Sequence, residues 1–217
     1  MASKEQEKEE KKDREIKNTS DIQEVSFELK IPKERIAILI GKDGETKNKI
    51  EEASDVKIDI NSEEGDVFIT GKNALNVFNA SEVVKATARG FNPEIALLLL
   101  KVDYVLEIIN LKNIAKNKNH LQRIKGRIIG SEGKTRRIIE ELTICNISVY
   151  GKTIGIIGRA ENCTVAKQAI EMIIEGSPHS AVYKFLEKKQ KSMRIASLNG
   201  NDISTEIKEK FQKFNKE

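Results

Sequence analysis

The chain has 217 residues, 38% of them hydrophobic and 33% charged, and a formal net charge of +4. That length allows one or two domains, each large enough to bury a core. The longest apolar run, residues 95–100, is far shorter than the roughly 20 residues that cross a bilayer. The charged N-terminal segment contains no apolar signal-peptide stretch. We therefore expect a cytoplasmic protein without membrane contact.

The charge is divided unevenly along the chain. Residues 1–24, 25–90 and 91–110 each have two more acidic than basic side chains, whereas residues 111–190 have fifteen Lys and Arg against seven Asp and Glu. Residues 191–217 add a further +2. This asymmetry favours a polyanionic partner for residues 111–190.

Residues 1–23 alternate Lys and Glu with almost no apolar side chains, and we expect them to be disordered because they cannot bury enough surface to offset their ordering entropy. Apolar periodicity then predicts a first domain over residues 24–91. Its expected elements are a strand at 25–31, a helix at 32–40, a glycine turn at 41–44, a helix at 45–53, strands at 56–60 and 67–70, and a helix at 72–89.

The same order returns over residues 92–190, preceded by a linker helix, and leaves residues 191–217 as a C-terminal tail. The predicted class is α/β (α+β), with two domains of the order strand, helix, helix, strand, strand, helix, each with a three-stranded sheet. The expected elements are a linker helix at 93–100, a strand at 104–109, helices at 120–129 and 134–142 around a glycine turn, strands at 147–150 and 153–157, and helices at 164–175 and 181–191.

The two domains share a repeated Gly-x-x-Gly motif. It occurs at residues 40–47 (IGKDGETK) and again at residues 129–136 (IGSEGKTR), with Gly41 and Gly130 separated by 89 positions. A repeat of this length is a whole small domain rather than a solenoid unit. The protein is therefore predicted to contain two copies of one binding module.

A tight turn between two helices places the start of the second helix at the surface, where unpaired amide groups and the helix dipole attract anions. Glycine at both ends lets a sugar-phosphate strand approach the backbone. Bases of a single strand would then lie over an apolar groove, and some of the groove residues must also serve the core. The candidates are Ile36, Ile40, Ile58 and Ile60 in the first copy, and Ile128, Ile129, Ile147 and Val149 in the second.

The order of elements and the repeated turn match the KH module, which binds single-stranded nucleic acid. The runs at 125–143, 147–153 and 175–183 resemble, more closely still, the archaeal tandem-KH ribosome-assembly family, to which the eukaryotic partner of Nob-one is related. The resemblance covers residues 25–190. It implies two type I KH-like domains, binding of single-stranded RNA at the 3′ region of small-subunit rRNA, and cooperation with the endonuclease that trims that end.

The second copy is predicted to be the main RNA site, because basic side chains surround its turn and the first copy has a net negative charge. An acid in each turn, Asp43 and Glu132, weakens the expected phosphate contact. A helix corner that needs glycine for geometry alone is the alternative explanation. The predicted RNA-binding residues are Arg127, Ile128, Ile129, Gly130, Ser131, Gly133, Lys134, Arg136 and Arg137, with Gly41, Lys42 and Gly44 in the first copy.

Catalytic and metal-binding patterns are missing from the sequence. A P-loop that includes Gly133 and Lys134 would need glycine at position 128, where Ile128 stands. The two histidines have no metal-ligand spacing to the cysteines. We therefore expect no enzyme activity, cofactor, metal or small-molecule substrate, and we expect Cys145 and Cys163 to be reduced core residues.

The alternative function is a scaffold without RNA. In that case the two modules would make protein contacts, and the basic second copy would dock on an acidic protein. Competition by single-stranded RNA separates the two functions, because a scaffold that binds only proteins is indifferent to it.

Overall fold

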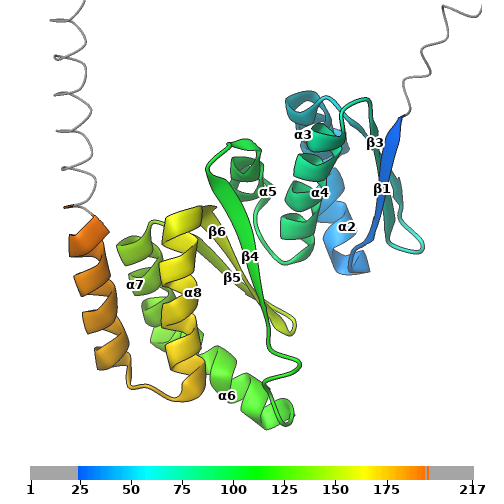
Figure 1. The fold of residues 1–217 in the computed structure, drawn as a ribbon. Helices are drawn as coiled ribbons and strands as arrows, with labels where there is room; N and C mark the ends of the chain where they lie inside the picture. Colours follow the sequence, from blue (N-terminus) through cyan, green and yellow to red (C-terminus); the bar gives the residue numbers. More distant parts are fainter. Residues whose placement is uncertain (1–23, 194, 196–217) are drawn as a thin grey trace, which may run out of the picture.

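The computed structural model describes residues 24–193 and 195. These residues form two modules, each with a three-stranded antiparallel sheet and helices packed on it (Figure 1). The expectations for residues 1–23 and for most of the C-terminal tail lie outside the described residues. No helix in the described part of the chain is both long enough and apolar enough to cross a membrane.

The first module contains the predicted elements in the predicted order. Its sheet has the order β1-β3-β2, so the last strand in sequence is the central one. The elements are β1 (Val25–Lys30), α2 (Lys33–Ile40), a 3-10 turn (Lys42–Gly44), α3 (Glu45–Ser54), β2 (Lys57–Asn61), β3 (Asp66–Gly71) and α4 (Ala74–Ala88).

The linker and the second module follow the same plan. The linker consists of α5 (Pro93–Ala96) and a 3-10 helix (Leu97–Leu100). The second sheet has the order β4-β6-β5, the same as the first. Its module contains β4 (Tyr104–Asn110), α6 (Lys118–Ile129), a 3-10 turn (Ser131–Gly133), α7 (Lys134–Thr143), β5 (Asn146–Tyr150), β6 (Thr153–Arg159), α8 (Ala160–Glu175) and a final helix over residues 179–193.

Three helices of the second module begin earlier than predicted. The carbonyl oxygen of the Asn117 side chain accepts a hydrogen bond from the backbone nitrogen of His120 at 2.8 Å, and this cap starts α6 at Lys118. α8 follows β6 with no connecting loop, because the backbone nitrogen of Ala160 donates to the carbonyl oxygen of Asp103. The final helix starts at residue 179, directly after Pro178.

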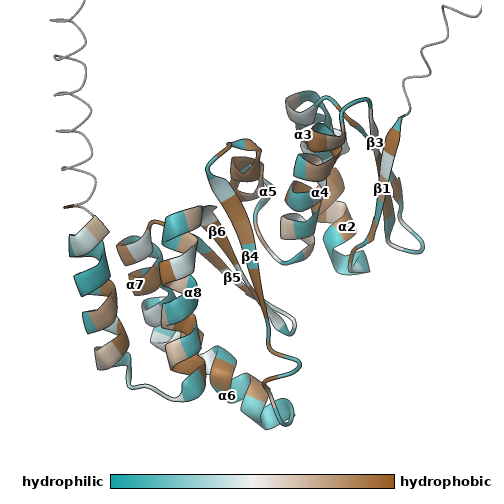
Figure 2. Cartoon of the chain, viewed as in Figure 1, coloured by the Kyte–Doolittle hydropathy of each residue, from teal (hydrophilic) through white to brown (hydrophobic). Residues whose placement is uncertain are grey.

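The central strand β6 is buried on both faces. Successive residues of a strand point to opposite sides, and here Ile156 packs into the core of the second module while Ile157 packs into that of the first. This explains why β6 is apolar along its length instead of alternating. Figure 2 shows the matching hydrophobic stretch along its neighbour β4. The second sheet is therefore sandwiched between its own helices and the linker.

Phe91 holds the two modules together. Its side chain is 3% exposed and belongs to the core of the first module. Its ring lies so close to β6 that a Cβ atom added to Gly155 would meet a ring carbon at 2.5 Å. The backbone oxygen of Phe91 accepts a hydrogen bond from the Arg35 guanidinium at 2.6 Å. Phe91 thus joins the first module, the linker and the second sheet.

Polar contacts close the same boundary at the edge strand β5. The Ser148 hydroxyl donates to the backbone oxygen of Arg89 at 2.9 Å. The Tyr150 hydroxyl donates to the carboxylate of Glu34 on α2. Partial burial and this carboxylate raise the pKa of Tyr150, so the phenol remains protonated and keeps donating at neutral pH.

Cys145 and Cys163 are both buried, as predicted, and neither forms a disulfide. Their sulfur atoms are 4.0 Å apart. The contact with Cys145 and burial together raise the pKa of the Cys163 thiol. That thiol therefore stays protonated and behaves as a small core side chain.

Replacing Phe91 with alanine should lower the free energy of unfolding by about 3–5 kcal/mol, the usual cost of truncating a buried Phe. Phe68→Ala is the matched control, because Phe68 is 41% exposed on the outer face of the first sheet, and a surface substitution costs about 0.5 kcal/mol or less. Urea unfolding followed by circular dichroism measures both. Equal losses would contradict the role of Phe91 as the contact between modules.

Candidate nucleic-acid interface

Both glycine turns adopt the same backbone. In the second module α6 ends at Ile129, Gly130 follows with φ 75° and ψ 176°, Glu132 and Gly133 are left-handed, and α7 begins at Lys134. In the first module Gly41 (φ 76°, ψ −178°) starts the same series of conformations. The repeat seen in the sequence is therefore a repeat of geometry, in which two helices meet at a three-residue 3-10 turn.

The first glycine of each turn is required by the fold. A Cβ atom on Gly130 would lie 2.7 Å from the backbone nitrogen of Thr135, and one on Gly41 would lie 2.8 Å from that of Thr46. Their backbone conformation is also one that essentially only glycine adopts. The fold alone therefore explains why glycine occupies these two positions, whether or not a ligand binds.

The turn in the second module presents backbone and side chains to solvent. Ser131 and Glu132 are exposed, and so is Lys134 at the start of α7. Gly133, at the N-cap position, provides no side-chain cap for the helix. The start of α7 carries the positive end of the helix dipole, and the backbone nitrogen of Lys134 donates to the carbonyl oxygen of Ser131.

Two residues of the predicted RNA-binding set have structural roles. Ile128 is 0% exposed and lies in the core of the second module, so its side chain is not at the surface of the turn. The Arg127 guanidinium donates to the backbone oxygens of Ile173 and Ser177 at 2.7 and 2.5 Å. Arg127 therefore caps the C-terminal end of α8, and its charge serves the fold instead of an exposed phosphate site.

The remaining basic residues lie on two sides of α7. Lys134 and Arg137 line one hollow together with Ser131 and Glu132, and an Arg137 nitrogen donates to the backbone oxygen of Glu132 at 3.0 Å. Arg136 lies on the other side, in a hollow beside β5. The structure thus brings Lys134 and Arg137 together at the turn and places Arg136 on the side of α7 that faces the sheet.

Ile129 remains a candidate for base contact. Its side chain is 36% exposed at the end of α6, directly before the glycine turn. In the first module Gly41, Lys42 and Gly44 keep the same backbone, and Lys42 is exposed. That module has no counterpart of the Lys134 and Arg137 pair, because Glu45 and Asn48 occupy the equivalent positions.

A repeated carboxylate positions the strand beside the turn. Glu140 on α7 accepts a hydrogen bond from the backbone nitrogen of Ile147 at 2.8 Å, and Glu51 accepts one from Ile58 at 2.6 Å. Both pairs obey the 89-residue repeat. Each glutamate satisfies an amide of an edge strand and fixes the width between helix and strand. The sequence carried this signal in the repeated Ile-Glu-Glu, but its role was not predicted.

The final helix supports the turn from behind. The Tyr183 hydroxyl lies 3.1 Å from the hydroxyl of Thr135, the residue packed against Gly130. His179 lies 2.9 Å from the backbone oxygen of Arg127, near the end of α6. The helix over residues 179–193 thus fixes both helices that meet at the turn.

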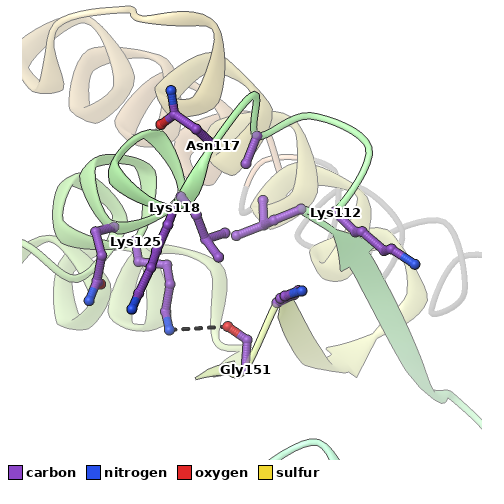
Figure 3. Close-up of a pocket in the computed structure, with 10 residues that line it drawn as sticks. Lys112, Asn117, Lys118, Lys125 and Gly151 are labelled. Atoms are coloured by element: carbon purple, nitrogen blue, oxygen red, sulfur yellow. Dashed lines mark hydrogen bonds between the residues drawn. The ribbon is translucent and has the colours of Figure 1, made fainter.

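Sequence reasoning also missed a basic hollow at the opposite end of α6. The connection before α6, the first turns of α6 and the β5–β6 hairpin enclose about 570 Å³ (Figure 3). We call this hollow the lysine pocket, because four lysines line it. Its lining residues are Leu111, Lys112, Ala115, Asn117, Lys118, Leu121, Gln122, Lys125, Gly151 and Lys152.

Among the residues that the structure describes, no group of His, Cys, Asp or Glu is arranged to hold a metal ion. The surface around the second turn instead offers backbone amides, lysine and arginine. Such groups bind phosphate.

Two family models match the two modules. Residues 26–86 match the KH domain, and residues 105–191 match the eukaryotic type KH domain, type I. The chain is 44% identical over 191 residues to a KH domain-containing protein of Methanocaldococcus jannaschii, covering 86% of this chain and 84% of that one. It is 35% identical over 131 residues to the pre-rRNA-processing protein pno1 of Aspergillus fumigatus, and spans about half of that longer protein (51%).

Solved structures of related proteins are similar to this chain in both fold and sequence. Dim2p from Pyrococcus horikoshii is 48% identical with a TM-score of 0.71, and the match covers 76% of this chain and 99% of Dim2p. The same species provides a crystal structure of an a/eIF2alpha-aDim2p-rRNA complex, with one chain 46% identical and a TM-score of 0.75 over 79% of this chain and 97% of that one. The predicted pair of KH domains is confirmed.

Gly130→Ala should lower the free energy of unfolding by about 1–3 kcal/mol, the cost of holding a side chain in a region reserved for glycine, with a further loss from the contact with Thr135. Gly126→Ala is the matched control on the same helix, since a Cβ there meets nothing within 4 Å. It should stabilise the protein by about 0.5–1 kcal/mol. Thermal and urea unfolding compare the two variants, and a neutral Gly130→Ala would contradict the structural role of this glycine.

Proposed function

The chain belongs to the Dim2/Pno1 family of tandem KH proteins, and from this premise we propose that it binds the single-stranded 3′ region of small-subunit rRNA through its second module during ribosome assembly. The family comprises non-enzymatic RNA-binding factors of pre-rRNA processing. The chain is accordingly not an enzyme, and its role in the proposal is to hold and present a strand.

The observation that carries the proposal is the uncapped start of α7, exposed between two basic side chains. Lys134 and Arg137 are exposed and line one hollow beside it. A phosphate at this point would gain the favourable end of a helix dipole and two cations. Glu132 is the one acid in the turn. It has a left-handed backbone and is exposed, so its carboxylate can extend into solvent.

Bases of the strand would lie between the turn and the edge strand β5. Ile129 and Val149 offer partly exposed apolar surface there, and Arg136 faces the same side of α7. With aromatic residues at 5% of the chain and no Trp, aromatic stacking contributes little. Recognition would therefore combine phosphate capture with apolar contact and hydrogen bonds to base edges.

The first module has a supporting role in this proposal. It shares the turn geometry and contributes Lys42, but its sequence has a net negative charge. It also forms the boundary of the hollow beside β5, which residues 90–92 and Ile95 help to line. We infer that it shapes the site of the second module and contacts RNA weakly.

Partners enter the proposal by similarity. The related Dim2p is found with a/eIF2alpha and rRNA in a crystal structure, and we propose both as partners of this chain. We also propose cooperation in the cytoplasm with the endonuclease that trims the 3′ end of the small-subunit rRNA. A scaffold that contacts only proteins is the alternative that the next experiment addresses.

Ser131→Asp should weaken binding to a 3′-end rRNA oligonucleotide at least tenfold, about 1.4 kcal/mol, because it places a second acid beside Glu132 where the phosphate would approach. Ser131 is exposed, so the fold should be unchanged. Fluorescence anisotropy measures the affinity, with circular dichroism as a check of folding. Ser131→Asp is a better test than a substitution of Gly130, because the fold requires glycine at position 130.

Lys42→Asp is the comparison in the first turn, since Lys42 occupies the position equivalent to Ser131, and it changes the charge by two units where Ser131→Asp changes it by one. We expect a smaller loss than for Ser131→Asp. A larger loss would reverse the ranking of the two modules. If the wild-type protein binds neither this strand nor a scrambled one, the scaffold alternative takes over.

Salt should weaken the complex in a graded way. About three or four phosphate contacts on a single strand predict a slope near −2 to −3 in a plot of log affinity against log salt, at roughly 0.7 per contact. Titrations at increasing potassium chloride concentration measure it. A flat plot would contradict the electrostatic part of the proposal.

A further inference from the structure

We propose that a hollow in the second module, away from the glycine turn, is the docking site of the chain's own C-terminal segment, residues 203–214. The hollow encloses about 670 Å³ where α7 ends, α8 begins and the final helix ends (Figure 1). Its lining includes Val102, Asp103, Ile144, Arg159, Glu161 and Met193. The contact is intramolecular and does not depend on RNA binding.

Ile144 is a strained and exposed apolar residue in the lining of this hollow. It follows α7 directly and has φ 55° and ψ 39°, a left-handed conformation that is an outlier for a β-branched residue. Its side chain is 74% exposed, so no core contact offsets the strain. The equivalent residue of the first module is Asp55, a type that adopts the same conformation more readily. Isoleucine at position 144 is therefore favourable only where another apolar surface covers it.

Two more apolar side chains are open at this end of the module. Val102 lines the hollow just before β4 and is 100% exposed. Ile195, two residues after Met193, is 58% exposed. Single apolar side chains are ordinary at a protein surface, but a group of them around a hollow is typical of an interaction surface.

The C-terminal segment begins beside the hollow and carries a matching apolar stripe. Met193 lines the hollow, and residues 196–217 follow shortly after it. Within them four large apolar side chains recur at spacings of four, four and three, the pattern of one face of a helix. They are Ile203, Ile207, Phe211 and Phe214.

The connection to that stripe is suited to a reversal of the chain. Residues 196–202 include the run Asn199-Gly200-Asn201-Asp202, which is typical of a turn. Fully extended, the connection reaches roughly 24 Å, and a helix over residues 203–214 is about 18 Å long. A tether this short gives an effective concentration on the order of millimolar. It favours the chain's own segment over a separate protein as the occupant.

The charges of the two surfaces are complementary. The rim of the hollow has the exposed acids Asp103 and Glu161 against one exposed base, Arg159. Residues 203–214 contain three lysines and two glutamates. The opposite net charges favour one orientation of the segment, while the apolar stripe supplies most of the affinity.

Hydrogen exchange of the full-length protein tests the contact. Amides of residues 203–214 should exchange at least about tenfold more slowly than those of a synthetic peptide of the same sequence, because a docked helix must open before it exchanges. This protection should not change with protein concentration. Exchange as fast as in the peptide overturns the proposal. Protection that grows with concentration assigns the hollow to a second copy of the chain and also overturns it.

Ile144→Asp places the residue of the first module in the second, and the two explanations predict opposite results. Without a docked segment, aspartate relieves the backbone strain, and the melting temperature rises or stays the same. With docking, the melting temperature should fall by about 2–4 °C, and residues 203–214 should exchange like the peptide. Leu75→Asp, at a residue of α4 that is 63% exposed, is the matched control and should leave that exchange unchanged.

Phe211→Ser removes the other side of the same contact. In this background Ile144→Asp should no longer lower the melting temperature, because its partner is already lost. An equal effect of Ile144→Asp in both backgrounds overturns the proposal, and so does protection of residues 203–214 that survives Ile144→Asp. None of these results bears on RNA binding at the glycine turn, which the Ser131→Asp variant tests separately.

Discussion

The contact between a glycine and the threonine five residues after it is the constraint on which the interface depends. Because Gly130 lacks a side chain, the backbone of Thr135 can fold back against it, and α7 then starts at the surface. The same contact between Gly41 and Thr46 builds the first turn. In the second module the Tyr183 hydroxyl also contacts the Thr135 hydroxyl, so the final helix supports the geometry of the turn.

The two modules have the same backbone fold but different net charges. The way they pack together suggests a reason for the difference in charge. β6 lies between two apolar surfaces, one of which belongs to the first module and its linker. The first module covers that face with Phe91 and its neighbours, and its sequence has two more acidic than basic side chains. The second module carries the net positive charge, and its first helix has 12 residues where the equivalent helix of the first module has 8.

The order of elements could be predicted from the sequence, because alternation, helical periodicity and the repeated glycines are local signals. The roles of single residues at the site depended on partners far along the chain. Arg127 and Ile128 follow each other, yet one reaches carbonyl oxygens 46 and 50 positions later and the other points into the core. The lysine pocket was not predicted for the same reason. Its lysines are far apart in the sequence and come together only because the hairpin packs against α6.

Phe91 and the second face of β6 also bear on how the protein can be divided. A fragment that begins at β4 would keep the basic turn and the lysine pocket, but it would expose Ile157 and the ring-sized space beside Gly155 to water. Exposed apolar sheet surface promotes self-association. The second module is therefore expected to aggregate when it is expressed alone, because the first module and the linker cover an apolar face of its sheet.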